Sequence, residues 1–303
     1  MSAQRTVRPG YAVGLASMLR PLRRGLGDPT YKIIGEDHWR AIRTPHGPAT
    51  LRLRQRDADA VVESEAWGEG AEWALEQVPA LLGADDRPEE FRTDDPLLAT
   101  LLERFEVPRF GRTGLVMEAL VPSIIEQKVT NHEAFRGFGN LVRRFGEAAP
   151  GPGADHGLRL QPSPEALRAI PSWDWLRLPV DPARSKAVLQ AARVASAVER
   201  TAGLPGEEVE RRLTTIPGVG EWTVAEVRQR ALGDPDAVSF GDYHLAKDVG
   251  WALTNAAWDD DRLRDYLESF RPHRARVVAL IYRGAGKRPR RGPKMSPRTH
   301  LPS

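Results

Sequence analysis

Short runs with partial two-residue alternation of apolar and polar side chains dominate the first third of the chain. Residues 31–35, 38–43 and 49–54 are rich in β-branched and aromatic side chains, and turn compositions separate them. This pattern predicts a small antiparallel sheet, which Val61 and Val62 extend. Residues 70–82 carry apolar side chains at helical spacing, so we expect a helix packed on one face of that sheet.

Helical spacing dominates the rest of the chain. Apolar stripes with spacings of three and four recur over residues 97–105, 135–145 and 263–270. Pro122 lies inside an apolar run, where a helix either begins or is kinked. The pattern predicts an α+β fold that is predominantly α. We expect a small N-terminal α/β domain with an antiparallel sheet over residues 1–87 and a helical core over 88–283.

Composition excludes several kinds of site. With 303 residues the chain is long enough for two domains, and it contains no cysteine, which rules out disulfides, thiol nucleophiles and thiolate metal sites. The seven histidines are scattered without a ligand-like spacing, so we expect no metal site. No apolar run approaches a membrane span and no signal peptide is evident. We therefore expect a cytoplasmic protein with no membrane partner.

Charge is strongly segregated along the chain, although the net charge is only +3. Basic residues exceed acidic ones by eight in residues 1–56 and by seven in 283–303, whereas 57–112 has an excess of ten acids. Basic ends fit a partner with a phosphate backbone, and they fit solubilising tails equally well. Residues 284–303 contain four prolines and no acid, which predicts a disordered basic tail.

The most informative segment is residues 207–232. Leu213 and Ile216 end one short helix, Pro217-Gly218-Val219-Gly220 forms a tight hairpin, and a second helix follows. The two glycines leave backbone amides uncovered at the positive end of that helix, which suits one DNA phosphate, while Val219 anchors the turn from below. An ordinary interhelical turn is the alternative, because such glycines also close turns without a ligand.

Asp242 is the candidate catalytic carboxylate. It lies twenty-two residues after Gly220, at the start of another helix with an apolar face. In that position an aspartate is either an N-cap or a catalytic group, and the two roles are compatible because capping also fixes the side chain. Asp234, Asp236 and Asp248 rank lower, since the first two lie in a turn and the third lies within the helix.

Together these motifs resemble the helix-hairpin-helix DNA glycosylases, and within them the 3-methyladenine DNA glycosylase II branch. The hairpin and Gly241-Asp242-Tyr243 carry the resemblance. Residues 124–130 resemble the segment of that branch that enters the minor groove, residues 270–274 resemble its late W-x-P-[WYH]-R stretch, and the N-terminal sheet resembles its small α/β domain. The likeness covers most of residues 30–284 and is strongest over 213–250.

The resemblance implies specific roles. Asp242 matches the catalytic aspartate, which would stabilise an oxocarbenium-like sugar and activate a water. Members with lyase activity have a lysine where this chain has Trp222, which implies a monofunctional hydrolase. Trp222 either stacks on a flipped base or bridges two helices in the core. No redox or organic cofactor is implied, and the one ion to consider is a monovalent cation at the hairpin carbonyls.

The chain departs from the family pattern at three places. Glu226 replaces a typically aromatic residue and either attracts a cationic base or faces solvent, and Tyr282 is all that remains of an aromatic pair. Lys128 replaces an apolar wedge and either contacts phosphate or is merely exposed. Gln127 is expected to touch the unpaired partner base. The residues expected to contact DNA are Gln127, Lys128, Gly218, Val219, Gly220 and Thr223.

The expected function is removal of alkylated bases, of the 3-methyladenine type, from double-stranded DNA by base flipping, by a monomer that associates with the nucleoid. One alternative is a catalytically silent lesion-sensing protein, which the altered pocket favours. Another is a glycosylase for deaminated or oxidised bases. An assay of free-base release from methylated duplex DNA separates the first two, and a panel of single-lesion duplexes separates the third.

Overall fold

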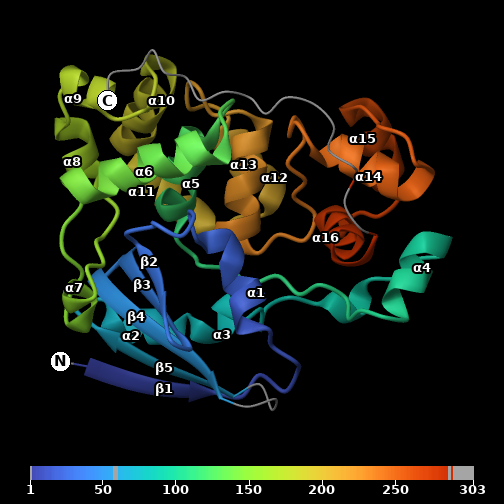
Figure 1. Ribbon diagram of the computed structural model, residues 1–303, viewed down its shortest axis with the longest axis horizontal. Helices are drawn as coiled ribbons and strands as arrows, with labels where there is room; N and C mark the ends of the chain where they lie inside the picture. Colours follow the sequence, from blue (N-terminus) through green and yellow to red (C-terminus); the bar gives the residue numbers. More distant parts are fainter. Residues whose placement is uncertain (1, 57–60, 286–287, 289–303) are drawn as a thin grey trace.

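The computed structural model describes residues 2–56, 61–285 and 288 (Figure 1). A sheet built from the N-terminal segment occupies one end of the molecule, and helices form the other end. No helix in these residues is long and apolar enough to cross a membrane. The predicted fold class, α+β and predominantly α, is confirmed.

The sheet has five antiparallel strands in the order β1-β5-β4-β3-β2. The strands are β1 (Ser2–Val7), β2 (Tyr31–Ile34), β3 (Asp37–Thr44), β4 (Gly47–Arg56) and β5 (Val61–Trp67). Four of them were predicted from alternation. β1 was missed because it is an edge strand with mostly exposed side chains, so its sequence lacks an apolar face.

Short helices cover one face of the sheet. They are α1 (Leu15–Leu19), the 3-10 turn η1 (Arg20–Leu22), α2 (Ala71–Glu76) and α3 (Val78–Leu81). Side chains from both layers, such as Leu51, Val62 and Leu75, form one apolar cluster. The predicted helix over 70–82 is therefore present, although it is divided before Pro79, which is in the first turn of α3.

Two further apolar clusters hold the helical part. The first contains α5 (Val116–Glu126), α6 (Asn131–Phe145), α8 (Pro164–Ala169), α9 (Ser172–Arg177), α10 (Pro182–Arg193), α11 (Ala195–Glu199), α12 (Gly206–Leu213), α13 (Glu221–Val227) and the π-helical turn η4 (Arg228–Leu232). The second contains α4 (Pro96–Leu102), α14 (Leu245–Thr254), α15 (Asp260–Glu268) and α16 (Arg274–Gly284). Shorter elements are η2 (Pro88–Glu90), α7 (Pro152–Asp155) and η3 (Arg200–Gly203).

Helix α5 is the centre of the first cluster and packs between α6 and α13 (Figure 1). It begins at Val116 and runs through Pro122, so the helix does not begin at the proline. The Glu199 carboxylate accepts hydrogen bonds of 2.9 Å from the amides of Val116 and Met117. A residue distant in sequence therefore caps this helix, which explains why no local N-cap is evident there.

Most of the expected basic tail, residues 284–303, lies outside the described residues. Within the described part, Gly284 ends α16, and Arg288 Nε lies 3.2 Å from Asp248 Oδ1. The division into domains at residue 87 stays a prediction.

Candidate active site

The hairpin between α12 and α13 has the geometry expected for a phosphate site at one of its two glycines. Gly218 has a φ of +89°, and a Cβ there would lie 2.7 Å from the Cβ of Ala187. A Cβ at Gly220 would meet nothing within 4 Å. The Gly220 side of the turn, at the N-terminus of α13, is therefore open to a ligand, whereas Gly218 is needed for the backbone path.

Val219 faces the protein, as its anchoring role requires. Its side chain is 5% exposed and belongs to the first apolar cluster, and its amide donates a 2.9 Å hydrogen bond to the Ile216 carbonyl. Neither group is directed to an outside ligand. The expectation that Val219 itself contacts DNA is corrected to a structural role under the turn.

Gln127 and Thr223 brace the hairpin. The Gln127 side-chain amide donates to the Gly218 carbonyl (2.9 Å) and to the Thr223 hydroxyl (2.7 Å). Thr223 is 1% exposed, so its side chain does not reach the surface, and its expected DNA contact is corrected to support of Gln127. The amide nitrogen that was expected to meet a partner base is used inside the protein.

Lys128 lies at the junction of α5 and α6. It is exposed and has a φ of +55°, a left-handed conformation that costs a non-glycine residue about 1–3 kcal/mol. The next helix starts with a capping box in which Thr130 and Glu133 bond reciprocally, and this fixes the direction of the chain after Lys128. The lysine side chain is therefore presented to solvent beside Gln127 and the hairpin.

Asp242 is half-buried and lies two residues before His244, the N-cap residue of α14, so it is at the helix start as expected. Its Oδ1 accepts hydrogen bonds from the amides of His244 (2.8 Å) and Leu245 (3.0 Å). The preceding residue, Gly241, has a φ of +86°, and its amide donates 2.8 Å to Asp260 Oδ2 in α15. The carboxylate thus has a fixed direction, because both its own oxygen and the backbone before it are held.

The three rival aspartates are each paired with an arginine. Asp236 lies 2.8 Å from Arg274, Asp234 lies 2.8 Å from Arg228, and Asp248 lies 3.2 Å from Arg288. These carboxylates are committed to structural ion pairs, which supports their lower rank as catalytic candidates.

Glu226 was expected either to attract a cationic base or to face solvent, and it has neither kind of surroundings. It is 9% exposed, Oε1 accepts a 2.5 Å hydrogen bond from the Ser239 hydroxyl, and Oε2 lies 2.6 Å from Arg230 Nη1. It faces neither solvent nor an open pocket, so its expected contact with the base is corrected. No pattern in the sequence indicates this pairing, because Ser239 is in a different segment of the chain.

The hydrogen bond between Glu226 and Ser239 connects the helix that contains Trp222 with the loop that contains Asp242. Trp222 is half-buried and lies four residues before Glu226, on the same face of the helix. Ser239 lies three residues before Asp242, whose amide donates 3.2 Å to the Ser239 carbonyl. The Asp242 loop is therefore attached, through Ser239, to α13 one helical turn after Trp222. The fourth predicted site residue, Tyr282, is 47% exposed on α16, which packs against α14.

Tyr243 has an exposed aromatic side chain to which the sequence pattern assigned no role. It is 73% exposed directly after Asp242, and the Lys247 ammonium lies 3.6 Å from the ring centroid. An exposed aromatic ring beside a candidate catalytic carboxylate offers a second stacking surface. The signal was present in the Gly-Asp-Tyr motif, where only the aspartate was interpreted.

Comparison of the sequence with known proteins finds a relative over part of the chain. No family model matches the chain. The chain is 33% identical over 183 residues to the probable bifunctional transcriptional activator/DNA repair enzyme AlkA of Mycobacterium tuberculosis, and the same match is found in two strains. The match covers 56% of this chain and 35% of the relative, so the chain spans about a third of the relative's length.

Solved structures decide the fold. The 3-methyladenine DNA-glycosylase of Archaeoglobus fulgidus superposes with a TM-score of 0.77 at 19% identity, over 92% of this chain and 97% of that one. The Clostridium acetobutylicum 8-oxoguanine glycosylase/lyase, in complex with double-stranded DNA containing cytosine opposite 8-oxoguanine, gives 0.66 at 14% identity, over 93% and 97%. The chain has the fold of the helix-hairpin-helix DNA glycosylases. The resemblance in the sequence is confirmed.

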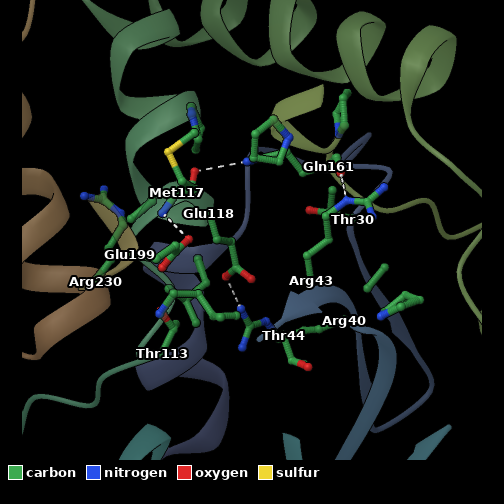
Figure 2. Close-up of a pocket in the computed structure, with 18 of the residues that line it drawn as sticks. Thr30, Arg40, Arg43, Thr44, Thr113, Met117, Glu118, Gln161, Glu199 and Arg230 are labelled. Atoms are coloured by element: carbon green, nitrogen blue, oxygen red, sulfur yellow. Dashed lines mark hydrogen bonds and ion pairs between the residues drawn. The ribbon is translucent and has the colours of Figure 1, made fainter. Parts of the chain in front are cut away.

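This glycosylase fold encloses a cavity of about 370 Å³ between the sheet and the helices (Figure 2). Glu118 of α5 points at Arg40 of β3, and the two form an ion pair, while Glu199 is turned to the Met117 amide. Burial raises the pKa of Glu118 and of Glu199, although Arg40 and the α5 amides oppose this rise. The residues that line the cavity include neither Asp242 nor Trp222. The cavity is therefore separate from the candidate active site of the glycosylase fold.

Proposed function

We propose that this protein is a DNA glycosylase that hydrolyses the N-glycosidic bond of alkylated bases, of the 3-methyladenine type, in double-stranded DNA. The observation that carries the proposal is the Asp242 carboxylate, held by the amides of His244 and Leu245 at the start of α14, in a loop bonded to the helix that carries Trp222. A directed carboxylate beside an aromatic ring suits a reaction that develops positive charge on a sugar. The AlkA relative is described as a DNA repair enzyme, which supports this activity.

In the proposed reaction the lesion leaves the base stack and enters the site beside Trp222. The bond between C1′ and the base nitrogen breaks, and its electrons leave with the base. Asp242 stabilises the oxocarbenium-like sugar, and a water attacks C1′ and loses a proton to the carboxylate. An alkylated purine already carries a positive charge, so its departure does not require a strong general acid.

DNA is the proposed partner, and the protein is proposed to act as a monomer. The open Gly220 side of the hairpin is suited to one phosphate at the N-terminus of α13. Lys128, exposed at the end of α5, is proposed to enter or flank the minor groove. The neighbour from C. acetobutylicum was solved with double-stranded DNA, which supports this partner.

The hairpin carbonyls are compatible with the proposed monovalent cation. The carbonyl of Ile216 accepts a bond from Val219, and that of Gly218 accepts one from Gln127. A carbonyl oxygen has two lone pairs, so each of these oxygens retains one for an ion. A cation held there would reinforce the attraction of the hairpin for a phosphate.

A monofunctional reaction is proposed because an indole stands where lyases have their amine. Trp222 cannot form a Schiff base with the abasic sugar. This point needs its own measurement, because the fold neighbours include a glycosylase/lyase. Borohydride reduction of a reaction with lesion-containing duplex should give no covalent protein–DNA adduct, and strand cleavage should require alkali.

The deciding experiment is free-base release. Purified protein is incubated with methylated duplex DNA and, in parallel, with duplexes that each contain one alkylated, deaminated or oxidised base, and free bases are separated by chromatography. We expect 3-methyladenine in the product. Release of only deaminated or oxidised bases would replace the proposed substrate class. Tight lesion binding without release of any base would identify a lesion-sensing protein instead.

A further inference from the structure

A buried chain of polar contacts holds the Asp242 loop against α13. The Ser239 hydroxyl donates 2.5 Å to Glu226 Oε1, and the other oxygen of Glu226 lies 2.6 Å from Arg230 Nη1. The side chains of Glu226 and Arg230 are 12% and 14% exposed. Gln229 adds a second attachment, since its amide donates 2.7 Å to the Ala237 carbonyl in the same loop.

Arg230 extends this set of polar contacts to residues near the start of the chain. Arg230 Nε donates 3.0 Å to the Pro21 carbonyl, and the nearby Arg24 Nε lies 2.8 Å from Glu126 Oε1 at the end of α5. Burial raises the pKa of Glu126, and the charges of Arg24 and Arg230 oppose this rise. Glu126 directly precedes Gln127 and lies within residues 124–130, so the chain of contacts reaches the segment expected in the minor groove.

Stability alone is a weak reason for this arrangement. A buried ion pair gains little over well-packed apolar side chains, because taking both charges out of water costs as much as their attraction returns. Such a pair does fix the relative orientation of the segments that it joins, since each oxygen of Glu226 has one specific donor. The Glu226–Ser239 bond also joins the helix that carries Trp222 to the loop that carries Asp242, the two groups whose separation matters for base release.

We propose that Glu226 and Arg230 are a positioning pair that fixes the Asp242 loop against α13 and thereby sets the carboxylate relative to the base stacked at Trp222. This inference rests on the proposed function. Glu226 touches neither base nor sugar in this arrangement, because both of its oxygens are bonded within the protein. Without the negative charge, Arg230 is left buried without its carboxylate partner. A neutral amide has one acceptor oxygen and cannot accept from both Ser239 and Arg230, so the loop gains freedom.

The test compares the full-length protein with Glu226→Gln and Ser239→Ala under single-turnover conditions, together with duplex affinity and the thermal midpoint. A displacement of about 1 Å can cost on the order of 10²-fold in rate, so we expect a loss of that order in both variants. Duplex affinity should change little, because neither side chain is at the proposed DNA surface. The double variant should be hardly slower than Glu226→Gln, since the two residues act through one bond.

Glu208→Gln is the matched control. Glu208 pairs with Arg211 and Arg212 on exposed α12, and its loss should leave the rate unchanged. An unchanged rate in both loop variants overturns the inference, as does a loss of rate matched by an equal loss of duplex affinity. Amide hydrogen exchange of residues 238–245 is measured in parallel and should accelerate in both variants but not in the control. If wild type releases no base at all, the proposed function fails, while unchanged exchange overturns the positioning role separately.

Discussion

Asp242 Oδ1 accepts a 3.0 Å hydrogen bond from the backbone amide of Leu245, the first residue of α14. The residue proposed to do the chemistry therefore also bonds the amides of His244 and Leu245 at the start of a helix, as a capping side chain does. These hydrogen bonds give a partner to an amide that has none within the helix, and they fix the carboxylate at the positive end of the helix. The fold and the proposed reaction both require the Asp242 carboxylate in this position. Its role in stability can therefore be separated from its role in the reaction only by a substitution that keeps these hydrogen bonds.

Asp242→Asn is that substitution. Asparagine caps helices about as well as aspartate, so the thermal midpoint should stay close to that of wild type. The amide has no negative charge and cannot take a proton from water, so base release should fall by about 10²-fold or more. Single-turnover release and duplex affinity measured on the same preparation check this expectation.

Asp248→Asn is the control, because Asp248 lies within the same helix and pairs with Arg288. It should release base at the wild-type rate. Undiminished release by Asp242→Asn would show that another group activates the water and would remove the central assignment.

The hairpin glycines should separate folding from DNA binding. Gly218→Ala puts a Cβ 2.7 Å from Ala187 at a φ of +89°, and should lower the free energy of unfolding by about 1–3 kcal/mol. Gly220→Ala, at a φ of −111° with open space around it, should leave stability almost unchanged. Its methyl group would instead crowd an incoming phosphate, so duplex affinity should fall. Urea unfolding and equilibrium duplex binding measure the two effects, and equal affinity of Gly220→Ala and wild type would argue against a phosphate at that position.

Local features of the site could be predicted from sequence. The place of Asp242 at a helix start, the turn at Gly218 and the helical stripe that begins at residue 97 depend on residues close together in the chain, where backbone chemistry leaves a pattern. The same holds for the alternation in β3 and β4. Residue type and spacing carry this information because the interacting groups are at most a few residues apart.

Contacts between distant segments could not be predicted in this way. Gln127 bonds the hairpin from the end of α5, and Glu226 bonds Ser239 across a turn and a loop. Glu226 and Gln127 are the type of side chain that normally lies at the surface, so their residue type suggested contact with solvent or DNA. The packing of α5 against α13 makes Gln127 an internal brace, and the fold of the loop after η4 back onto α13 does the same for Glu226. No spacing in the sequence encodes either arrangement.

Protonation of His273 should lower stability below neutral pH. The ring is 9% exposed, and burial together with the adjacent Arg276 lowers its pKa from the usual 6.5. The Arg276 Nε donates 3.3 Å to His273 Nδ1, which requires that nitrogen to be unprotonated. Above about pH 6.5 both the folded and unfolded forms are neutral; as the pH falls below that value the unfolded chain takes the proton first, so the free energy of unfolding decreases.

His273→Gln retains a hydrogen-bond acceptor and removes the titration. The difference in unfolding free energy between about pH 7.5 and pH 5.5 should shrink by at most about 1.4 kcal/mol, because only about one pH unit of that range lies below the unfolded pKa. His38, whose pKa burial also lowers, is present in both proteins and so cancels in the comparison. An identical pH dependence of the two proteins in urea titrations would show that His273 does not contribute.

Residues 289–303 offer a test of the basic C-terminus that leaves the Arg288–Asp248 pair intact. The deletion removes Arg290, Arg291, Lys294 and Arg298. For every DNA phosphate that the shortened protein no longer neutralises, the slope of log K against log salt should become shallower by about 0.9, because fewer counterions are released when DNA binds. Single-turnover release at saturating protein should not change, since the deleted segment is remote in sequence from Asp242. A slope equal to that of the full chain would show that the basic residues of 289–303 do not contact DNA and serve solubility instead. The DNA affinity would then come from the hairpin, Lys128 and the N-terminal arginines.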